Sequence, residues 1–170
     1  MIIRWIGASM ILIASAGFAM MIALIHKKEV STLKNLVLAL DFMECELQYR
    51  MHALPELCTM TAGECPAVLR DVFSDLALQL EDQISPDVRY CMRSVLSGRK
   101  NIPAQALECL YLLGDSLGRF DLQGQITGLE NVKSECRERL KRLKASGESQ
   151  LRSYQILGIC SGAALIIILI

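Results

Sequence analysis

Two long apolar segments, one near each end of the chain, constrain its fold more than any other feature. From Trp5 to Ile25 the sequence contains no Asp, Glu, Lys, Arg or His. As an α-helix, this run of about 21 residues would be about 31 Å long. That length matches the hydrocarbon core of a bilayer. The sequence therefore predicts an N-terminal transmembrane helix within residues 1–27.

The second apolar segment extends from Ile156 to Ile170. Its length of about 15 residues is below the usual minimum of about 17 for a spanning helix. A short span can be accommodated by local thinning of the bilayer or by pairing with a neighbouring helix. We expect residues 154–170 to form a C-terminal transmembrane helix, and a half-inserted tail is the alternative.

The first segment has a second interpretation, as a cleaved signal peptide. Arg4 precedes the apolar run, and Ala14-Ser15-Ala16 has the small residues of a cleavage site. However, the run continues well past that site to Ile25, and the basic cluster His26-Lys27-Lys28 follows the run instead of preceding it. We therefore expect a retained membrane anchor.

Basic residues beside the two segments predict the orientation in the membrane, because positively charged flanks stay in the cytosol. Arg4 stands alone before the first segment. The basic residues that flank the segments on their other sides are more numerous: Lys27, Lys28, Lys34, Arg137, Arg139, Lys141, Arg142, Lys144 and Arg152. The central domain, residues 28–153, is therefore predicted to be cytosolic, with both termini across the membrane.

The charges of the central part argue against nucleic-acid binding. Every acidic residue, and every basic residue except Arg4, lies between the two apolar segments, where they nearly balance. The basic stretch before the second segment is interleaved with Glu135, Glu138 and Glu148, which is typical of a solvated helix face. The seven cysteines are odd in number and have no close pair in sequence. This spacing favours reduced thiols in a cytosolic domain over a disulfide framework or a zinc site.

The central part has the periodicity of an all-α domain. Apolar residues recur there at spacings of three and four, and β alternation is absent. All four prolines stand where a helix could begin, and three glycines stand where one should end: Pro55, Pro66, Pro86, Pro103, Gly63, Gly98 and Gly118. The predicted helices cover residues 30–52, 55–62, 66–83, 86–97 and 103–117.

A last helix is predicted to begin at Asp121. Its apolar positions repeat as far as Leu143, and only Gly147 interrupts it before the second apolar segment. One glycine costs only about 1 kcal/mol in a helix interior, so we expect this helix to continue through Ile170. The helix at 30–52 could likewise extend the first segment. The predicted fold is a bundle of about six helices between two transmembrane helices.

Enzyme signatures are absent from the sequence. The two histidines, His26 and His52, have no partner at catalytic or metal-binding spacing. The stretch Gly114-Asp115-Ser116-Leu117-Gly118 contains residue types of a nucleophile or phosphate site, but it follows no strand. We interpret it as a closely packed helix end. We therefore expect a non-enzymatic protein without catalytic residues, cofactor or metal ion.

A polar stretch, Glu44, Glu46, Tyr49 and Arg50, is the candidate for partner binding. Glu44 and Glu46 are two residues apart and do not share a helix face. A pair of carboxylates that work together as acid and base is therefore disfavoured. The stretch is either a solvated helix face or a surface that docks a partner.

Gly158 and Gly162 in the second apolar segment have the spacing that lets two helices approach closely. They could pack the two predicted spans together or bind another membrane protein, and a homo-oligomer is compatible with the same motif. Pairing within the chain is the simpler hypothesis because it needs no partner.

Three stretches resemble blocks of the stage III sporulation protein AB family. The first is Leu40–Tyr49 followed by Leu54–Leu57, the second is Leu113–Gln125, and the third is Leu157–Ile170. Their order and the layout of the chain agree with the family over nearly the whole length. The middle, from Cys58 to Cys109, matches only loosely.

The resemblance implies a component of the mother-cell complex that endospore-forming bacteria assemble in the outer membrane around the engulfed forespore. That complex is similar to specialised secretion systems, and the family's cytosolic domain resembles that of the type II secretion inner-membrane platform protein. The implied partners are the secretion-type ATPase of the complex, other membrane components of the channel and the lipid bilayer. The implied role is to couple that ATPase to the channel. The alternative is a generic membrane-tethered helical scaffold or sensor with another cytosolic partner.

Overall fold

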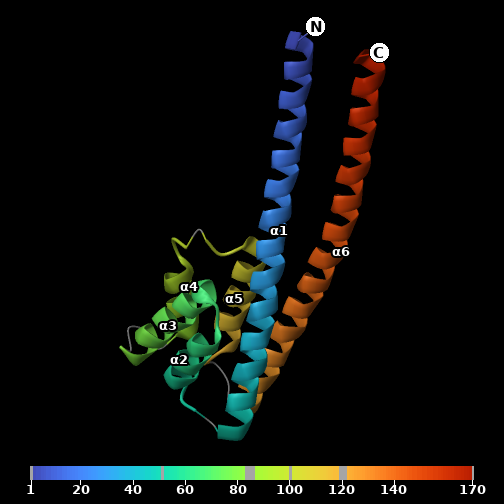
Figure 1. Cartoon of the computed structure of the whole chain (residues 1–170). Helices are drawn as coiled ribbons and strands as arrows, with labels where there is room; N and C mark the ends of the chain where they lie inside the picture. The colour runs from blue at the N-terminus through green and yellow to red at the C-terminus, as the bar shows by residue number, and fades with distance from the viewer. Residues whose placement is uncertain (1, 51, 83–86, 100, 119–121, 170) are drawn as a thin grey trace. The chain divides into compact units, whose positions relative to one another are not determined.

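The computed structural model describes the backbone of residues 2–50, 52–82, 87–99, 101–118 and 122–169, and the side chains of residues 17, 20–50, 52–82, 87–99, 101–118 and 123–147. These ranges contain six helices and no strand (Figure 1): α1 (Ile2–Arg50), α2 (Leu54–Glu64), α3 (Ala67–Glu81), α4 (Val88–Leu96), α5 (Ala104–Ser116) and α6 (Leu122–Leu169). The predicted all-α fold class is confirmed.

The helix ends follow the predicted punctuation closely. Pro55 lies in the first turn of α2, and Pro66 and Pro103 are the N-caps of α3 and α5. Pro86, where the fourth of these helices was predicted to begin, lies outside the described residues, and α4 begins at Val88. Its N-cap is Asp87, whose carboxylate accepts a hydrogen bond of 3.0 Å from the backbone N–H of Arg89. This bond satisfies one of the free N–H groups of the first turn.

Two of the three predicted helix-ending glycines have the left-handed backbone that such ends require. Gly98 follows α4 with φ of 91°, and Gly118 follows α5 with φ of 75°. Glycine adopts this conformation without steric cost. Gly63, by contrast, is inside the last turn of α2. The prediction that α6 continues into the second apolar segment is confirmed, and α1 likewise includes the whole first segment.

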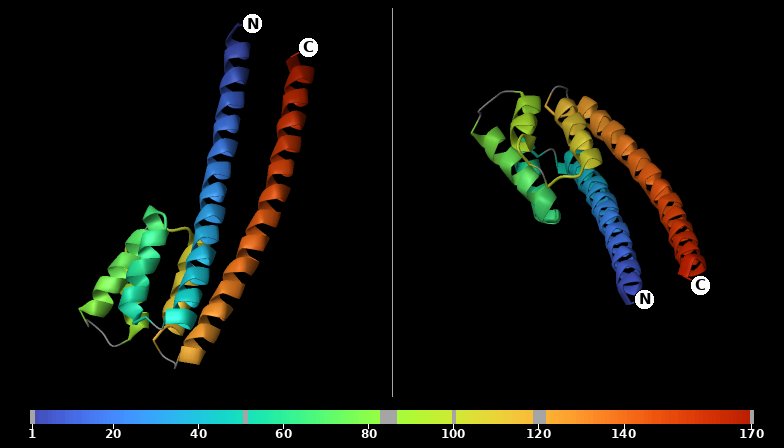
Figure 2. Two further views of the ribbon diagram at one scale, coloured as in Figure 1. Left: turned by 60° about the horizontal axis from the view of Figure 1, so that its bottom comes forward. Right: turned by 90° about the horizontal axis from the view of Figure 1, so that it is seen from above.

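Residues 29–141 form one compact unit. Its successive helices α2, α3, α4 and α5 pack against one another in chain order (Figure 2). The core receives side chains from all six helices: Leu33, Leu36, Leu40 and Met43 of α1, Leu57 and Cys58 of α2, Val72, Phe73 and Leu76 of α3, Cys91 and Met92 of α4, Cys109, Leu110 and Leu113 of α5, and Leu129, Val132 and Cys136 of α6. The three-and-four spacing read from the sequence is therefore the buried face of each helix.

Residues 1–28 and 142–170 form the other unit. In it the first part of α1 and the last part of α6 lie side by side (Figures 1 and 2). Within the described residues, no helix combines the length and the hydropathy that crossing a bilayer requires. Gly158 and Gly162 fall where side chains lie outside the described residues. The domain limits 1–27, 28–153 and 154–170 stay predictions.

Candidate partner-binding site

The four residues predicted to bind a partner lie near the end of α1, but they face different neighbours. Glu44 is directed at α6, where its carboxylate forms an ion pair with the ammonium group of Lys133. Only 15% of the Glu44 side chain is exposed. The same ammonium lies 3.1 Å from Asp41 Oδ1. The hydrogen bond to Glu44, followed by that to Asp41, raises the pKa of Lys133 against the effect of its desolvation. Glu44 therefore holds α1 to α6 and offers little surface to a partner.

A second set of ion pairs joins α6 to α1 and to α5. Arg137 donates two hydrogen bonds, of 3.1 and 3.2 Å, to the carboxylate of Asp41 on α1. Arg139 points to α5, where it pairs with Glu108, and it also donates a bond of 2.7 Å to Glu135. The bond to Glu108, followed by that to Glu135, raises the pKa of Arg139 above its usual value. These pairs fix α6 between α1 and α5.

Glu46 belongs to a different cluster, which we call the α1–α2 corner: Glu46, Tyr49, Arg50, His52 and Glu56. Glu46 Oε2 lies 3.5 Å from His52 Nε2 and 3.7 Å from Arg50 Nε. His52 Nδ1 in turn lies 3.1 Å from Glu56 Oε2. The imidazole therefore stands between two carboxylates. The Glu46–His52 contact, at 3.5 Å, is not a hydrogen bond.

The sequence indicates no partner of His52 at catalytic or metal-binding spacing, and the fold brings two carboxylates to it. Its partners are Glu46, six residues earlier on the other side of a helix end, and Glu56, four residues later in α2. The spacing of four between His52 and Glu56 was the only local signal. Among the described residues no group of His, Cys, Asp and Glu is arranged to hold a metal ion. The ion pair of the corner is that between Glu46 and Arg50.

Tyr49, Arg50 and Glu56 are the most accessible residues of the corner, and the first two belong to the predicted set. Tyr49 is 81% exposed, more than any other large apolar or aromatic side chain given for the described part of the chain. The Arg50 side chain is 63% exposed. Tyrosine and arginine are enriched at binding hot spots, where they combine a large contact area with polar groups. Two of the four predicted residues therefore present a surface, and the other two support it or serve another contact.

The stretch from Gly114 to Gly118 is a packed helix end, as its interpretation from the sequence stated. A Cβ atom on Gly114 would lie 2.7 Å from Cβ of Met92, so α5 approaches α4 very closely there. A Cβ atom on Gly118 would lie 2.4 Å from Cγ2 of Val88. Between them, Asp115 Oδ1 lies 2.6 Å from Nε of Arg89 on α4. Asp115 therefore joins α5 to α4, whereas the Ser116 hydroxyl donates a hydrogen bond to the carbonyl oxygen of Leu112 in its own helix.

The family of the chain follows from a match that extends over almost its full length. The family described as stage III sporulation protein AB matches residues 4–170. The chain belongs to this family. A solved structure of a stage III sporulation protein AB covers 71% of this chain and 97% of its own, with a TM-score of 0.61 at 17% sequence identity. That likeness supports the helical fold. Among curated proteins no match is found. Membership of the stage III sporulation protein AB family indicates a role in sporulation.

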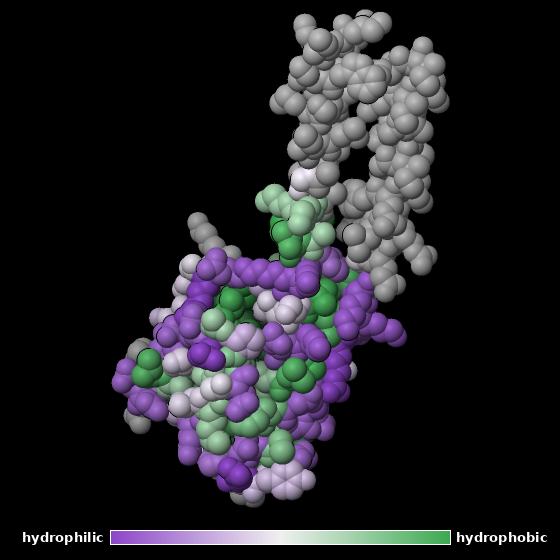
Figure 3. All heavy atoms as spheres, viewed as in Figure 1, coloured by the Kyte–Doolittle hydropathy of each residue, from purple (hydrophilic) through white to green (hydrophobic). Residues whose placement is uncertain are grey.

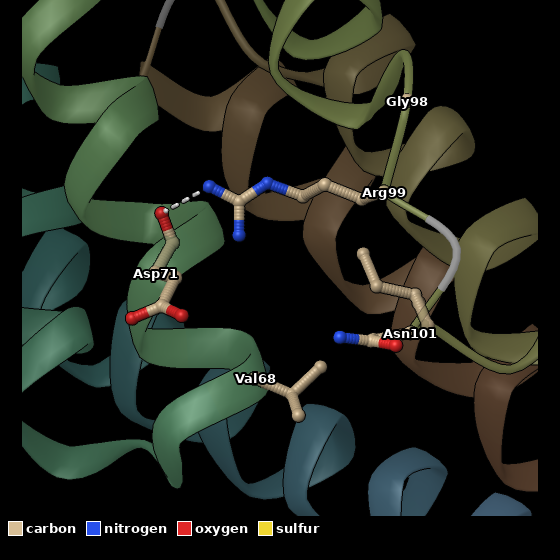
Figure 4. A pocket seen from close by; sticks show the side chains of 6 residues that line it. Val68, Asp71, Gly98, Arg99 and Asn101 are labelled. Atoms are coloured by element: carbon tan, nitrogen blue, oxygen red, sulfur yellow. Dashed lines mark hydrogen bonds between the residues drawn. The ribbon is translucent and has the colours of Figure 1, made fainter.

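This family member also contains a cavity of about 350 Å³ between α3 and the segment that joins α4 to α5 (Figure 4). Arg99 projects into it and donates hydrogen bonds of 3.2 Å to the carbonyl oxygens of Asp71 and Val95. Its guanidinium also pairs with Asp75. The carboxylate of Asp75 on α3 therefore competes with any anionic ligand for this guanidinium. The cavity lies where the segment between α4 and α5 packs against α3.

The buried cysteines of this sporulation protein act as small apolar side chains. Among the cysteines with described side chains, all are free thiols, and only Cys45 is exposed. Burial raises the pKa of Cys58 to about 12 and is the main cause that raises the pKa of Cys65 to about 11. Cys109 and Cys136, which are distant in sequence, share a hydrogen bond between α5 and α6. This bond, and then burial, raises the pKa of Cys136.

The surface of the 29–141 unit is mainly polar on the face shown in Figure 3, with smaller apolar areas between. The exposed large side chains Leu38, Tyr49, Leu78, Tyr90 and Leu112 come from four different helices, α1, α3, α4 and α5. These exposed side chains are therefore distributed over several helices of the unit.

Proposed function

We propose that this protein is a non-enzymatic platform, or adaptor, of a secretion-like channel complex in the mother cell during endospore formation. It couples a cytosolic secretion-type ATPase to the membrane apparatus. One observation carries the proposal: α1 and α6 each run without a break from an apolar segment into the helical bundle. A continuous helix transmits a displacement along its axis, whereas a flexible linker would absorb it.

The proposed location is the outer forespore membrane, facing the mother cell. The two apolar segments cross the bilayer, and the bundle lies in the mother-cell cytosol. The proposal is supported by the uncharged run from Trp5 to Ile25, by the apolar end from Ile156 to Ile170, and by the basic residues that flank both on the side of the bundle.

We place the ATPase contact at the α1–α2 corner. Tyr49 and Arg50 supply an exposed aromatic ring and an exposed guanidinium next to each other. Glu46 pairs with Arg50 one turn later on the same helix and also lies 3.5 Å from His52. A partner that binds there contacts the end of the same helix that contains the first apolar segment. The position therefore suits a coupling contact.

Binding of the full-length protein, in detergent or nanodiscs, to the purified cognate ATPase tests this site. The double variant Tyr49→Ala/Arg50→Glu should weaken binding at least tenfold, because truncated hot-spot residues cost about 2 kcal/mol or more. The matched control Tyr90→Ala/Arg93→Glu removes a similarly exposed pair from α4 and should leave the affinity unchanged. A wild-type protein that does not bind the ATPase would contradict the proposed function.

The alternative function is a membrane-tethered helical scaffold or sensor with a different cytosolic partner. Deletion of the gene separates the two. Under the platform proposal, sporulation stops after engulfment of the forespore. If the deletion strain forms normal spores, the platform proposal is wrong and the alternative gains support.

A further inference from the structure

A polar contact joins the end of the first apolar segment in α1 to the part of α6 that precedes the second apolar segment. His26 follows directly after the first apolar run, and its Nε2 lies 2.9 Å from the carbonyl oxygen of Leu143 on α6. A ring nitrogen that carries a proton donates to a carbonyl oxygen at this distance. The two residues are 117 positions apart in the chain. Both lie in the unit formed by residues 1–28 and 142–170.

The residue beneath the imidazole is Gly147, which is buried. A Cβ atom added to Gly147 would lie 2.4 Å from Cε1, 2.8 Å from Nε2 and 3.1 Å from Nδ1 of His26. Any larger residue at this position would displace the ring from the carbonyl of Leu143. Gly147 was expected from the sequence to be a tolerated interruption of the last helix. In the structure, its lack of a side chain leaves the space that the His26 ring occupies.

We propose that the two apolar segments pair with each other within one chain, and that the contact of His26 with Gly147 and Leu143 sets their register. Three observations support this. The contact joins the two helices directly, the two segments belong to one compact unit, and both helices continue unbroken beyond the contact to Ile2 and Leu169. The inference does not depend on the ATPase or on the α1–α2 corner.

Pairing within the chain has a physical consequence for the second segment. At about 15 residues it is shorter than a usual membrane span. A neighbouring helix that shares its length compensates for such a deficit. Under this proposal, the second segment pairs with the first segment of the same molecule. The alternative is that it pairs with a segment from a second copy of the chain.

Cross-linking in the full-length protein tests the pairing. In the double variant His26→Cys/Gly147→Cys, mild oxidation should produce a linked peptide pair in a band of monomer mass, detected by non-reducing electrophoresis and mass spectrometry. The matched control is Lys27→Cys/Gly147→Cys, because Lys27 is exposed on the neighbouring position of α1. It should form no such link. A band of doubled mass held by these cysteines, or no link in the first variant, would overturn the proposal.

A double-mutant cycle keeps the test independent of engineered thiols. Gly147→Ala should lower the Tm of the full-length protein, because the new methyl group displaces the His26 ring. The same substitution in the His26→Ala background should not lower the Tm and should raise it slightly through helix propensity, because no ring is there to displace. Equal losses in the two backgrounds would refute a direct contact between the residues.

Discussion

Glu44 and Tyr49 are close in sequence and were assigned to the same hypothesis, yet their side chains have different functions. Glu44 is bound by Lys133, which is 89 residues away in the chain, and Tyr49 faces solvent. The buried apolar side chains of α1, such as Leu36 and Leu40, could be predicted because their spacing is a local property of the helix. The partner of a charged residue could not, because it depends on which helix packs beside it.

At the same scale, burial of Cys58 predicts a specific pH dependence of stability. The pKa of its thiol is raised from 9.0 to about 12 in the folded protein, so the unfolded chain releases this proton first as the pH rises. Its contribution to stability is therefore complete below pH 9 and declines as the pH rises towards 12. We expect a loss of about 1 kcal/mol from this group between pH 8 and pH 10.

Thermal unfolding of wild type and Cys58→Ala under reducing conditions measures this effect. Other groups titrate over the same range in both proteins, so the difference between them isolates the thiol. Cys58→Ala should have the shallower decline. If the two proteins lose stability in parallel from pH 8 to pH 10, the thiol is not protected as described.

At the scale of the helices, prolines and glycines made most of the helix ends predictable. Pro66 and Pro103 precede helices because proline lacks the N–H that a first turn leaves unpaired. Gly98 and Gly118 follow helices because they adopt positive φ. The start of α4 is fixed by Asp87, whose carboxylate caps the first turn. The contact between His26 and Gly147 could not be predicted, because it depends on how α1 and α6 pack.

Substitution of two helical glycines by alanine should have opposite effects on stability, because one glycine is closely packed and the other is not. Gly114→Ala places a methyl group 2.7 Å from Cβ of Met92, which is fixed near the backbone, so we expect a loss of about 1–3 kcal/mol. Gly63→Ala meets no atom within 4 Å and lies inside α2. It should stabilise the protein by up to about 1 kcal/mol, through helix propensity.

Urea unfolding of the two variants and the wild type provides the measurement. The midpoint should fall for Gly114→Ala and rise for Gly63→Ala. A Gly114→Ala variant as stable as the wild type would mean that α4 and α5 can separate without cost, which would contradict the close approach at this glycine.

For the whole molecule, the sequence was sufficient for the all-α architecture and for the family, because helical periodicity and the three blocks extend along most of the chain. Membrane insertion, the orientation and the ATPase partner stay predictions and proposals. They depend on a bilayer and on a second protein, and the fold of one chain contains neither. The candidate site was found in part: Tyr49 and Arg50 are accessible, whereas Glu44 is occupied by Lys133.

The central claim is that this protein couples a cytosolic ATPase to a membrane complex in the sporulating mother cell. Co-purification of the tagged full-length protein from membranes of sporulating cells tests it most directly. The account predicts that the secretion-type ATPase is recovered with the wild type, is recovered with Tyr90→Ala/Arg93→Glu, and is lost with Tyr49→Ala/Arg50→Glu. If the tagged protein is absent from the membrane fraction, or is recovered there without the ATPase, the account is contradicted.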